Sequence, residues 1–538
     1  MPNWLKDAVF YEIYPQSFYD TNGDGIGDIR GIIQKLDYIK DLGCNALWIN
    51  PCFDSPFKDA GYDVRDYKKV AARYGTNEDL YELFKTAHEK GIRVLLDLVP
   101  GHTSEEHEWF KESGREERNE YSDRYIWTDF WIAGIAGHPY IGGECERNGT
   151  YMLNFFKCQP ALNYGFKEPK ERWQMSYLDA GPVATQDALI DIMRFWLDHG
   201  CDGFRVDMAD SLVKDDDNDK SATCSIWRRI RKILDEDYPE AALVSEWSNP
   251  YQSLNSAGFH MDFYLDHWNN GYNTLLRDYE TGGEDNSYFK KDGDGDIERF
   301  LKDYLPKYEA TSKNGYISFM TCNHDTPRPA RTLDERELKV AYAMLLTLPG
   351  VPFIYYGDEI GMKYIENMRT KEGGYTRTGT RTPMQWDNSA NCGFSSVEAE
   401  KLYLPVDPDA VTNGLTLEEQ GKREDSLYNM IRSLLALKHQ YSQLRADAGF
   451  GVKLGVKDSP FVYARENLLI AVNPKTSEKK AKFAEFAKDP SESFKGGVGE
   501  KEIFDMIKNA KEIFTIGKVS ITEDAIVMGP QSYVIFEM

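Results

Sequence analysis

The sequence predicts an α/β protein: a (β/α)8 TIM barrel with a subdomain inserted after its third strand and a C-terminal antiparallel β domain. Three observations support this fold class. Short apolar runs alternate with amphipathic helical segments, the alternation stops between residues 104 and 165, and closely spaced strands replace it from about residue 446. We therefore expect a barrel from residues 1–103 and 166–445, an insert at 104–165 and a β-sandwich at 446–538.

The predicted barrel strands are the eight apolar runs at 8–14, 46–50, 93–99, 203–209, 243–247, 259–265, 317–322 and 352–359. Helices are predicted at 32–42, 78–90, 185–198, 222–236, 336–347 and 424–440. Strands that alternate with helices form βαβ units of a parallel sheet, and eight such strands close a barrel. In the C-terminal part, the runs at 461–464, 468–472 and 533–536 predict antiparallel strands.

Composition narrows the class of protein. The chain has 538 residues with 88 acidic and 64 basic side chains, a net charge of −24. An acidic surface argues against nucleic acid and anionic membranes as partners. No apolar window is long enough for a membrane-spanning helix, the N-terminus does not resemble a signal peptide, and the eight cysteines lack metal-binding spacing. These features predict a cytoplasmic enzyme with reduced cysteines.

An acidic, glycine-rich loop follows the first strand. Oxygen side chains stand at relative positions 1, 3, 5 and 9, a glycine stands at 6, and position 7 offers a backbone carbonyl; the five expected ligands are Asp20, Asn22, Asp24, Ile26 and Asp28. This is the ligand rhythm of an EF-hand loop, although Gly31 replaces the bidentate glutamate at position 12. We predict one structural Ca²⁺ or Mg²⁺ site; the alternative is an acidic turn without an ion. The second acidic run, at 292–296, predicts a solvated loop.

The fourth predicted strand ends in a carboxylate. Arg205 and Asp207 are two residues apart, and side chains at i and i+2 point to the same face of a strand. The guanidinium can therefore orient Asp207 and favour its ionised form. The alternative is an ordinary ion pair at a strand end.

Polar residues also follow other strands: His102 follows the third, Glu246 ends the fifth, and His324 and Asp325 follow the seventh. Chemistry in (β/α)8 barrels occurs at the carboxyl ends of the strands. Three carboxylates converging there are costly unless they are paired or used. Two carboxyl groups about 5 Å apart are the requirement of a retaining glycosidase.

With these residues the chain resembles glycoside hydrolase family 13, the α-amylase superfamily, over nearly its whole length. The resemblance rests on Asp-Leu-Val-Pro-Gly-His-Thr-Ser at 97–104, Gln-Pro-Ala-Leu-Asn at 159–163, Gly-Phe-Arg-Val-Asp at 203–207, Glu246, and Asn-His-Asp at 323–325. It is strongest to exo-acting α-glucosidases, oligo-1,6-glucosidases and dextran glucosidases. Arg-Thr-Pro-Met-Gln-Trp at 381–386 and the metal loop are found in that branch and in its trehalose synthase relatives.

The resemblance implies three catalytic roles. Asp207 would be the nucleophile that forms a β-glycosyl–enzyme intermediate. Glu246 would be the general acid and then the general base, with a raised pKa. Asp325 would bind the 2- and 3-hydroxyls and stabilise the oxocarbenium-like transition state.

The resemblance also implies a substrate-binding set. Arg205 would orient the nucleophile, His102 and His324 would bind hydroxyls, and Tyr62 would stack under the sugar ring with Asp63 close behind it. Asp59 and Arg381 are similar to the pair that closes the pocket over the non-reducing end. For each histidine the alternative is a structural, hydrogen-bonded role.

Three positions depart from the family pattern. Gly101 replaces the usual asparagine before the strand-3 histidine, so the calcium site that this asparagine supports in α-amylases is not expected. Ala161 removes a carboxylate from the Gln-Pro-Asp-Leu-Asn motif. Met208, after the nucleophile, is neither the valine that accompanies α-1,6 preference nor the alanine or threonine that accompanies α-1,4 preference, so the linkage stays open.

The resemblance favours a retaining exo-acting α-glucosidase that hydrolyses α-1,4 or α-1,6 bonds of short oligosaccharides or disaccharides, without an organic cofactor. The alternative is a transglycosylase or isomerase of the same family, either trehalose synthase-like or sucrose-isomerising. The same covalent intermediate serves both outcomes. A non-catalytic relative, like the ectodomain of amino-acid transporter heavy chains, is disfavoured by the intact carboxylates.

Overall fold

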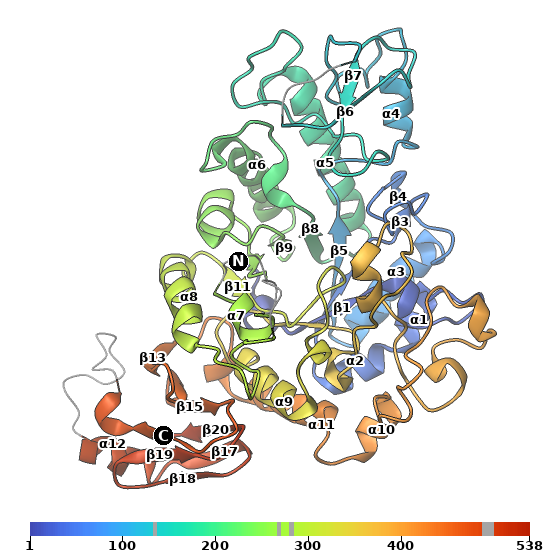
Figure 1. Cartoon of the computed structure of the whole chain (residues 1–538). Coiled ribbons are helices and arrows are strands. Elements are labelled where there is room, and N and C mark those ends of the chain that lie inside the picture. The colour runs from blue at the N-terminus through green and yellow to red at the C-terminus, as the bar shows by residue number, and fades with distance from the viewer. Residues whose placement is uncertain (133–136, 266–270, 279–283, 487–499) are drawn as a thin grey trace.

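A computed structural model of the protein describes residues 1–132, 137–265, 271–278, 284–486 and 500–538 (Figure 1). The predicted barrel is confirmed. Its parallel strands are β1 (Phe10–Ile13), β2 (Ala46–Ile49), β5 (Arg93–Leu98), β8 (Gly203–Val206), β9 (Ala242–Ser245), β10 (Met261–Phe263), β11 (Tyr316–Ser318) and β12 (Phe353–Tyr355). They lie in the order β11-β10-β9-β8-β5-β2-β1-β12, and a parallel bridge from Met320 to Phe353 joins the two ends of the sheet.

Helices surround the barrel close to their predicted positions. They are α3 (Asn77–Glu89), α5 (Ala180–Asp198), α6 (Ser221–Asp237), α9 (Glu335–Leu345) and α11 (Leu427–Gln440). The single helix predicted at 32–42 is wrong in detail. It is divided into α1 (Ile29–Gln34) and α2 (Leu36–Leu42), because Lys35 departs from helical geometry with ψ near 5°.

One long helix was absent from the sequence-based assignment. α8 (Ile297–Thr311) precedes β11, and its buried side chains Ile297, Phe300, Leu301 and Tyr304 follow helical spacing. Asp296 caps its N-terminus by accepting a hydrogen bond from the N–H of Glu298. The acidic run at 292–296, which was predicted as a solvated loop, therefore leads into this helix. The short helices α7 (Asn273–Leu276) and α10 (Leu417–Lys422) also lie outside the predicted set.

The barrel interior is packed with side chains from its strands. Phe10, Trp48, Leu95, Val244 and Phe353 belong to one buried cluster. Phe10 and Phe353 stack with ring centroids 4.3 Å apart. Alternate residues of each strand point inward, and a filled barrel leaves its carboxyl end as the place for a site.

The segment between β5 and α5 holds α4 (Glu108–Ser113) and the hairpin of β6 (Tyr140–Gly142) and β7 (Thr150–Met152). It lies beyond the carboxyl end of β5 (Figure 1). The bridge between His102 and Ala161 joins the segment to the end of that strand. The predicted insert after the third barrel strand is thereby confirmed.

The C-terminal antiparallel β fold is confirmed as two sheets at the opposite end of the molecule (Figure 1). One sheet contains β13 (Gly451–Leu454), β14 (Phe461–Arg465), β15 (Leu468–Asn473), β17 (Lys511–Ile516) and β20 (Ser532–Glu537). The other contains β16 (Lys479–Lys482), β18 (Val519–Ile521) and β19 (Ala525–Met528). Leu469, Val534 and Ile526 belong to a buried cluster shared by both sheets and by the helix α12 (Glu500–Ile507).

Within the described ranges, no helix combines the length and apolarity needed to cross a bilayer. All eight cysteines are unpaired, and seven of them are buried.

Candidate active site

A cavity of about 390 Å³ opens at the carboxyl ends of the barrel strands. It is lined by residues that follow the barrel strands β2, β5, β8, β9, β11 and β12, and by residues of the inserted segment. The lining residues are Asp59, Tyr62, His102, Phe155, Phe156, Asp207, Met208, Glu246, Asp325, Tyr375 and Arg377. The structure therefore brings the three predicted catalytic carboxylates together in one cavity.

Arg205 joins the acidic residues at the floor of this cavity. Its Nη1 donates to Asp207 and to Asp97, each at 2.9 Å, and its Nη2 donates to Glu246 at 2.6 Å. The Arg205 side chain is 1% exposed. A planar guanidinium holds five N–H donors in a fixed fork, so it sets the relative positions of the carboxylates that it binds more rigidly than an ammonium group would.

The local backbone explains this convergence. A Cβ at Gly203 would lie 2.0 Å from the carbonyl oxygen of Ala242, so only glycine lets β8 approach β9 this closely. The N–H of Asp207 then bonds the carbonyl of Leu98, and the N–H of Glu246 bonds the carbonyl of Val206. These bonds extend the parallel pairing by one residue and carry both carboxylates to the strand ends.

Asp207 and Glu246 share the guanidinium of Arg205. Burial raises the pKa of Asp207 well above its ordinary value, and the nearby Glu246 raises it further, while Arg205 opposes both effects. The expectation that Arg205 alone would set the ionisation of Asp207 was too simple, because the second carboxylate shares the same guanidinium. A second negative charge beside a carboxyl group disfavours its ionised form.

Met208 follows the nucleophile candidate in a left-handed backbone conformation, with φ of 39°. This conformation is costly for a residue with a side chain. It directs the N–H of Met208 toward Glu246 Oε2, at 3.1 Å, while the side chain lines the cavity.

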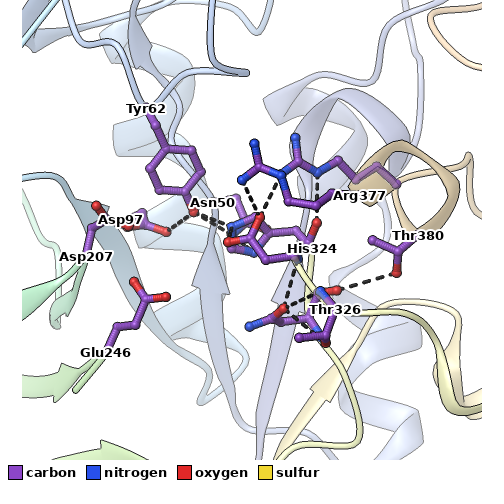
Figure 2. Close-up of polar contacts among 12 residues, drawn as sticks. Asn50, Tyr62, Asp97, Asp207, Glu246, His324, Thr326, Arg377 and Thr380 are labelled. Atoms are coloured by element: carbon purple, nitrogen blue, oxygen red, sulfur yellow. Dashed lines mark hydrogen bonds and ion pairs between the residues drawn. The ribbon is translucent and has the colours of Figure 1, made fainter. Parts of the chain in front are cut away.

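Tyr62 and His324 form a second network beside the acids (Figure 2). The Tyr62 hydroxyl lies 3.0 Å from Asp97 Oδ2 and 2.6 Å from His324 Nε2. On the other side of the ring, His324 Nδ1 lies 2.9 Å from Glu12 Oε1. Burial lowers the pKa of His324 well below its ordinary value and raises that of Glu12. The structure therefore buries the His324 ring between Tyr62 and Glu12.

Asp325 differs from Asp207 in the direction of its pKa shift. Burial alone would raise its pKa, but His324, Arg381 and Arg377 together lower it below the ordinary range. Arg381 Nη2 donates to Asp325 Oδ1 at 2.8 Å, and Arg377 Nη1 donates to the same oxygen at 3.1 Å. A permanently charged carboxylate suits the binding of sugar hydroxyls, since charge-assisted hydrogen bonds are the strong ones.

The expected pairing of Asp59 with Arg381 is wrong. Asp59 lies 3.5 Å from Arg377 Nη2, whereas Arg381 is buried and donates to Asp325 and to the carbonyl of His324. The two arginines are four residues apart in the same loop, and only Arg377 lines the cavity. Gln159 of the inserted segment completes the Asp59 environment by donating to its Oδ2 at 2.7 Å.

Asp63 does not line the cavity. Its carboxylate accepts hydrogen bonds from the N–H of Lys58, the N–H of Asp59 and the hydroxyl of Ser55. It therefore shapes the loop that carries Asp59 and Tyr62. His102 does line the cavity, and burial lowers its pKa to about 4.

The predicted metal loop folds around its own side chains. Asp20 accepts hydrogen bonds from the N–H groups of Asn22, Gly23 and Gly25 and from the hydroxyl of Ser395. Asp28 caps α1 by accepting from the N–H of Gly31. Across the described part of the chain, no group of three or more His, Cys, Asp or Glu side chains is arranged to hold a metal ion. The ion therefore stays a prediction that rests on the ligand spacing.

Sequence reasoning missed several residues of this site. Asp97 was recognised as part of a motif, but its role as a partner of Arg205 and Tyr62 was not assigned. Arg377 stands four residues before the recognised Arg-Thr-Pro motif, and that proximity was the available signal. Phe155 and Phe156 carried no signal, because aromatic residues also fill cores.

The family comparison agrees with this geometry. Residues 12–447 match the family described as "Alpha amylase, catalytic domain". The trehalose synthase/amylase TreS of Mycolicibacterium smegmatis is 33% identical over 504 residues, which cover 86% of this chain and 81% of that protein. An oligo-1,6-glucosidase of Heyndrickxia coagulans is 32% identical over 544 residues, which cover 88% and 92%.

Solved structures extend the similarity to the whole chain. The trehalose-6-phosphate hydrolase of Bacillus licheniformis has a TM-score of 0.78 at 26% identity and covers 100% of this chain and 99% of its own. An isomaltulose synthase mutant of Erwinia rhapontici, solved with sucrose, has a TM-score of 0.75 at 26% identity, with 100% and 99% coverage.

Proposed function

The chain belongs to the alpha-amylase catalytic-domain family of glycoside-cleaving enzymes, and from this premise we propose that it is a retaining exo-acting α-glucosidase. Its substrates would be short α-1,4- or α-1,6-linked glucosides. One observation carries the proposal: the buried guanidinium of Arg205 binds Asp97, Asp207 and Glu246 together, beside a cavity of about 390 Å³.

In the first step, Asp207 attacks the anomeric carbon and the glycosidic C–O bond breaks. Glu246 gives its proton to the departing oxygen, so the leaving sugar departs as a neutral alcohol. This step requires an ionised Asp207 and a protonated Glu246, so the two carboxyl groups together carry one proton when it begins. Asp325 would balance the positive charge that develops on the sugar ring, and Arg205 balances the negative charge that Asp207 carries before it attacks.

In the second step, Glu246 removes a proton from water as the water oxygen attacks the anomeric carbon. The bond to Asp207 breaks and glucose leaves with its original α configuration. The N–H of Met208 and the guanidinium of Arg205 hold the Glu246 carboxylate in place for both steps.

The exo-acting mode is supported by an ion pair between two residues that line the cavity. Arg377 lies 3.5 Å from Asp59, and Gln159 of the inserted segment donates to Asp59. This pair would form a wall that accepts a terminal glucose and blocks a longer chain. The wall would bind the hydroxyls of the non-reducing end.

A covalent trap tests the retaining mechanism. We expect 5-fluoro-α-D-glucosyl fluoride to inactivate the enzyme and to add one fluoroglucosyl group to the peptide that contains Asp207, measured by mass spectrometry after peptic digestion. The Asp207→Asn variant is the matched control and should stay unlabelled. Labelling of another carboxylate in the wild type would contradict the assignment of the nucleophile.

The alternative is an isomerase that transfers the glucosyl group to the sugar it has just released. Two observations support this alternative. The relatives include a trehalose synthase/amylase, and the aromatic rings of Phe155, Phe156 and Tyr375 line the cavity. Such rings can retain a released sugar by stacking. Incubation with maltose and labelled free glucose separates the outcomes, since an internal transfer would form trehalose without the label.

We also propose that the loop at 20–28 binds one structural Ca²⁺ or Mg²⁺ through Asp20, Asn22, Asp24, Asp28 and the carbonyl of Ile26. The ligand spacing supports this. Binding would require some loop hydrogen bonds to rearrange, because Asp20 already accepts four. A cytoplasmic location is proposed from the eight unpaired cysteines.

A further inference from the structure

The inserted segment reaches the catalytic cavity through a polar side chain that the mechanism has not used. A Cβ at Gly101 would lie 2.9 Å from Asn154 Nδ2, so the Asn154 amide occupies the space beside residue 101. From there Asn154 Nδ2 lies 3.0 Å from Nδ1 of His102. Asn154 follows β7, and His102 follows β5.

The hydrogen bonds around Asn154 have only one consistent direction. Lys214 Nζ lies 3.3 Å from Asn154 Oδ1 and, as an ammonium group, can only donate. The amide NH₂ must then face His102, whose Nδ1 has to accept. His102 Nε2 consequently carries the ring proton and donates it to the backbone carbonyl of Tyr62, at 2.9 Å.

The burial of these groups keeps the direction fixed. His102 is 1% exposed and Lys214 is 8% exposed. Burial lowers the pKa of His102 to about 4, so at neutral pH the ring is uncharged and has a single N–H. Lys214 is anchored independently by a 2.9 Å bond to the carbonyl of Ser211.

Asn154 also begins a short loop that is fixed at both ends against the cavity. Its own N–H bonds the carbonyl of Gln159, and the Gln159 side chain donates to Asp59. Phe155 and Phe156 lie between these two anchors and line the cavity. The loop therefore connects His102 on one side of the cavity with Asp59 on the other.

We propose that Asn154 is a positioning residue of the glucoside-cleaving site: it holds His102 in the Nε2–H tautomer, which fixes Tyr62, and it holds Phe155 and Phe156 at the cavity. This inference rests on the proposed function for its kinetic readout. Asn154 acts through His102 and does not touch the reacting atoms.

Two substitutions of Asn154 separate polarity from packing. Asn154→Asp keeps the size but cannot donate to Nδ1, so His102 must move its proton to Nδ1 or lose the bond. Asn154→Ala removes the bond without reversing it. We expect kcat/KM on p-nitrophenyl α-glucoside to fall about 10-fold for Asn154→Ala and about 100-fold for Asn154→Asp, mostly in kcat. Asn148→Asp, an exposed asparagine in the same segment, is the charge-matched control and should change kcat/KM less than about 2-fold.

The ring tautomer gives a readout that does not depend on activity. Two-dimensional ¹⁵N–¹H spectra of protein labelled at histidine, with His102 assigned by comparison with His102→Gln, report which nitrogen carries the proton. The wild type should show His102 as the Nε2–H form, and Asn154→Asp should shift it toward Nδ1–H. An unchanged tautomer in Asn154→Asp together with wild-type kinetics would overturn the proposal.

Gly101 provides an independent test. Gly101→Ala should displace the Asn154 amide and reduce kcat/KM about 10-fold, but it should have no further effect in the Asn154→Ala background. Additive losses would show that Asn154 and Gly101 act separately and would contradict the proposal. If neither the wild type nor any variant cleaves glucosides, the proposed function is wrong. The tautomer measurement would still decide whether Asn154 positions His102.

Discussion

Replacing Arg377 and Arg381 separately by alanine tests which arginine closes the cavity. Arg377 is 28% exposed and contacts Asp325 at 3.1 Å and Asp59 at 3.5 Å, whereas Arg381 is 2% exposed and donates to Asp325 and to the carbonyl of His324, each at 2.8 Å. A partly exposed ion pair contributes about 0–1 kcal/mol to folding. Removal of one partner of a buried pair costs about 3 kcal/mol or more.

The two variants should therefore fail in different ways. Arg377→Ala loses a charged hydrogen-bonding group on the sugar-facing wall, worth about 1.5–3 kcal/mol, so kcat/KM on disaccharides should fall about 10- to 150-fold. Its unfolding free energy should change by no more than about 1 kcal/mol. Arg381→Ala should lose about 3 kcal/mol of stability, because Asp325 loses one of its two arginine donors and the buried carbonyl of His324 loses its hydrogen bond from Arg381.

The assays are steady-state kinetics on maltose, isomaltose and maltotetraose, together with urea unfolding. Opening the wall in Arg377→Ala should also reduce the preference for the disaccharides over maltotetraose. Arg377→Lys is the matched control, and it should recover part of the activity because it keeps the charge. The reasoning would be refuted if Arg377→Ala kept full activity while Arg381→Ala stayed stable and lost only disaccharide binding. That result would identify Arg381 as the functional partner of Asp59.

Three further predictions follow from buried or clustered charges. Arg205→Lys should fold but lose about 100- to 1,000-fold in kcat/KM, because an ammonium cannot reproduce a fork that binds three carboxylates; near-normal kinetics would contradict the role of Arg205. Burial raises the pKa of Glu359 from 4.5 to about 7, so the folded state retains a proton that the unfolded state loses, and the free energy of unfolding should fall by about 3 kcal/mol as pH rises from 4.5 to 7. Glu359→Gln, which can still accept from Tyr11, should remove this dependence in denaturant titrations, and an unchanged slope would contradict it. Asp24→Ala or a chelator should lower the melting temperature more than it lowers the activity of the folded enzyme. Addition of about 1 mM Ca²⁺ should restore the melting temperature only in the wild type. A chelator without effect would contradict the predicted metal site.

The barrel could be predicted from the sequence because strand, loop and helix follow one another with little interruption. Four of the eight predicted strands, the third, fourth, fifth and seventh, end in polar residues, and counting strands places these residues and the three carboxylates at the same rim. α8 was missed although Phe300, Leu301 and Tyr304 follow helical spacing. Pro306 within it and the acidic run before it obscured a pattern that tertiary packing completes.

The polar contacts of the site were harder to predict. Choosing Arg377 over Arg381 as the partner of Asp59 depends on the path of one loop, since both arginines have the same charge and similar reach. Asn154 bonds His102 across 52 positions of the chain, and no local pattern indicates such a contact. The Asn154–His102 contact depends on how the inserted segment packs on the barrel, and the sequence motifs do not encode that packing.

The most direct test of the central claim is a product time course by NMR on maltose, isomaltose, sucrose, trehalose and soluble starch, with Asp207→Asn as the control. The account predicts early release of α-glucose from at least one disaccharide, little action on starch and no turnover by the variant. Release of β-glucose, long oligosaccharides from starch, or an unimpaired Asp207→Asn would contradict a retaining exo-glucosidase built around Asp207.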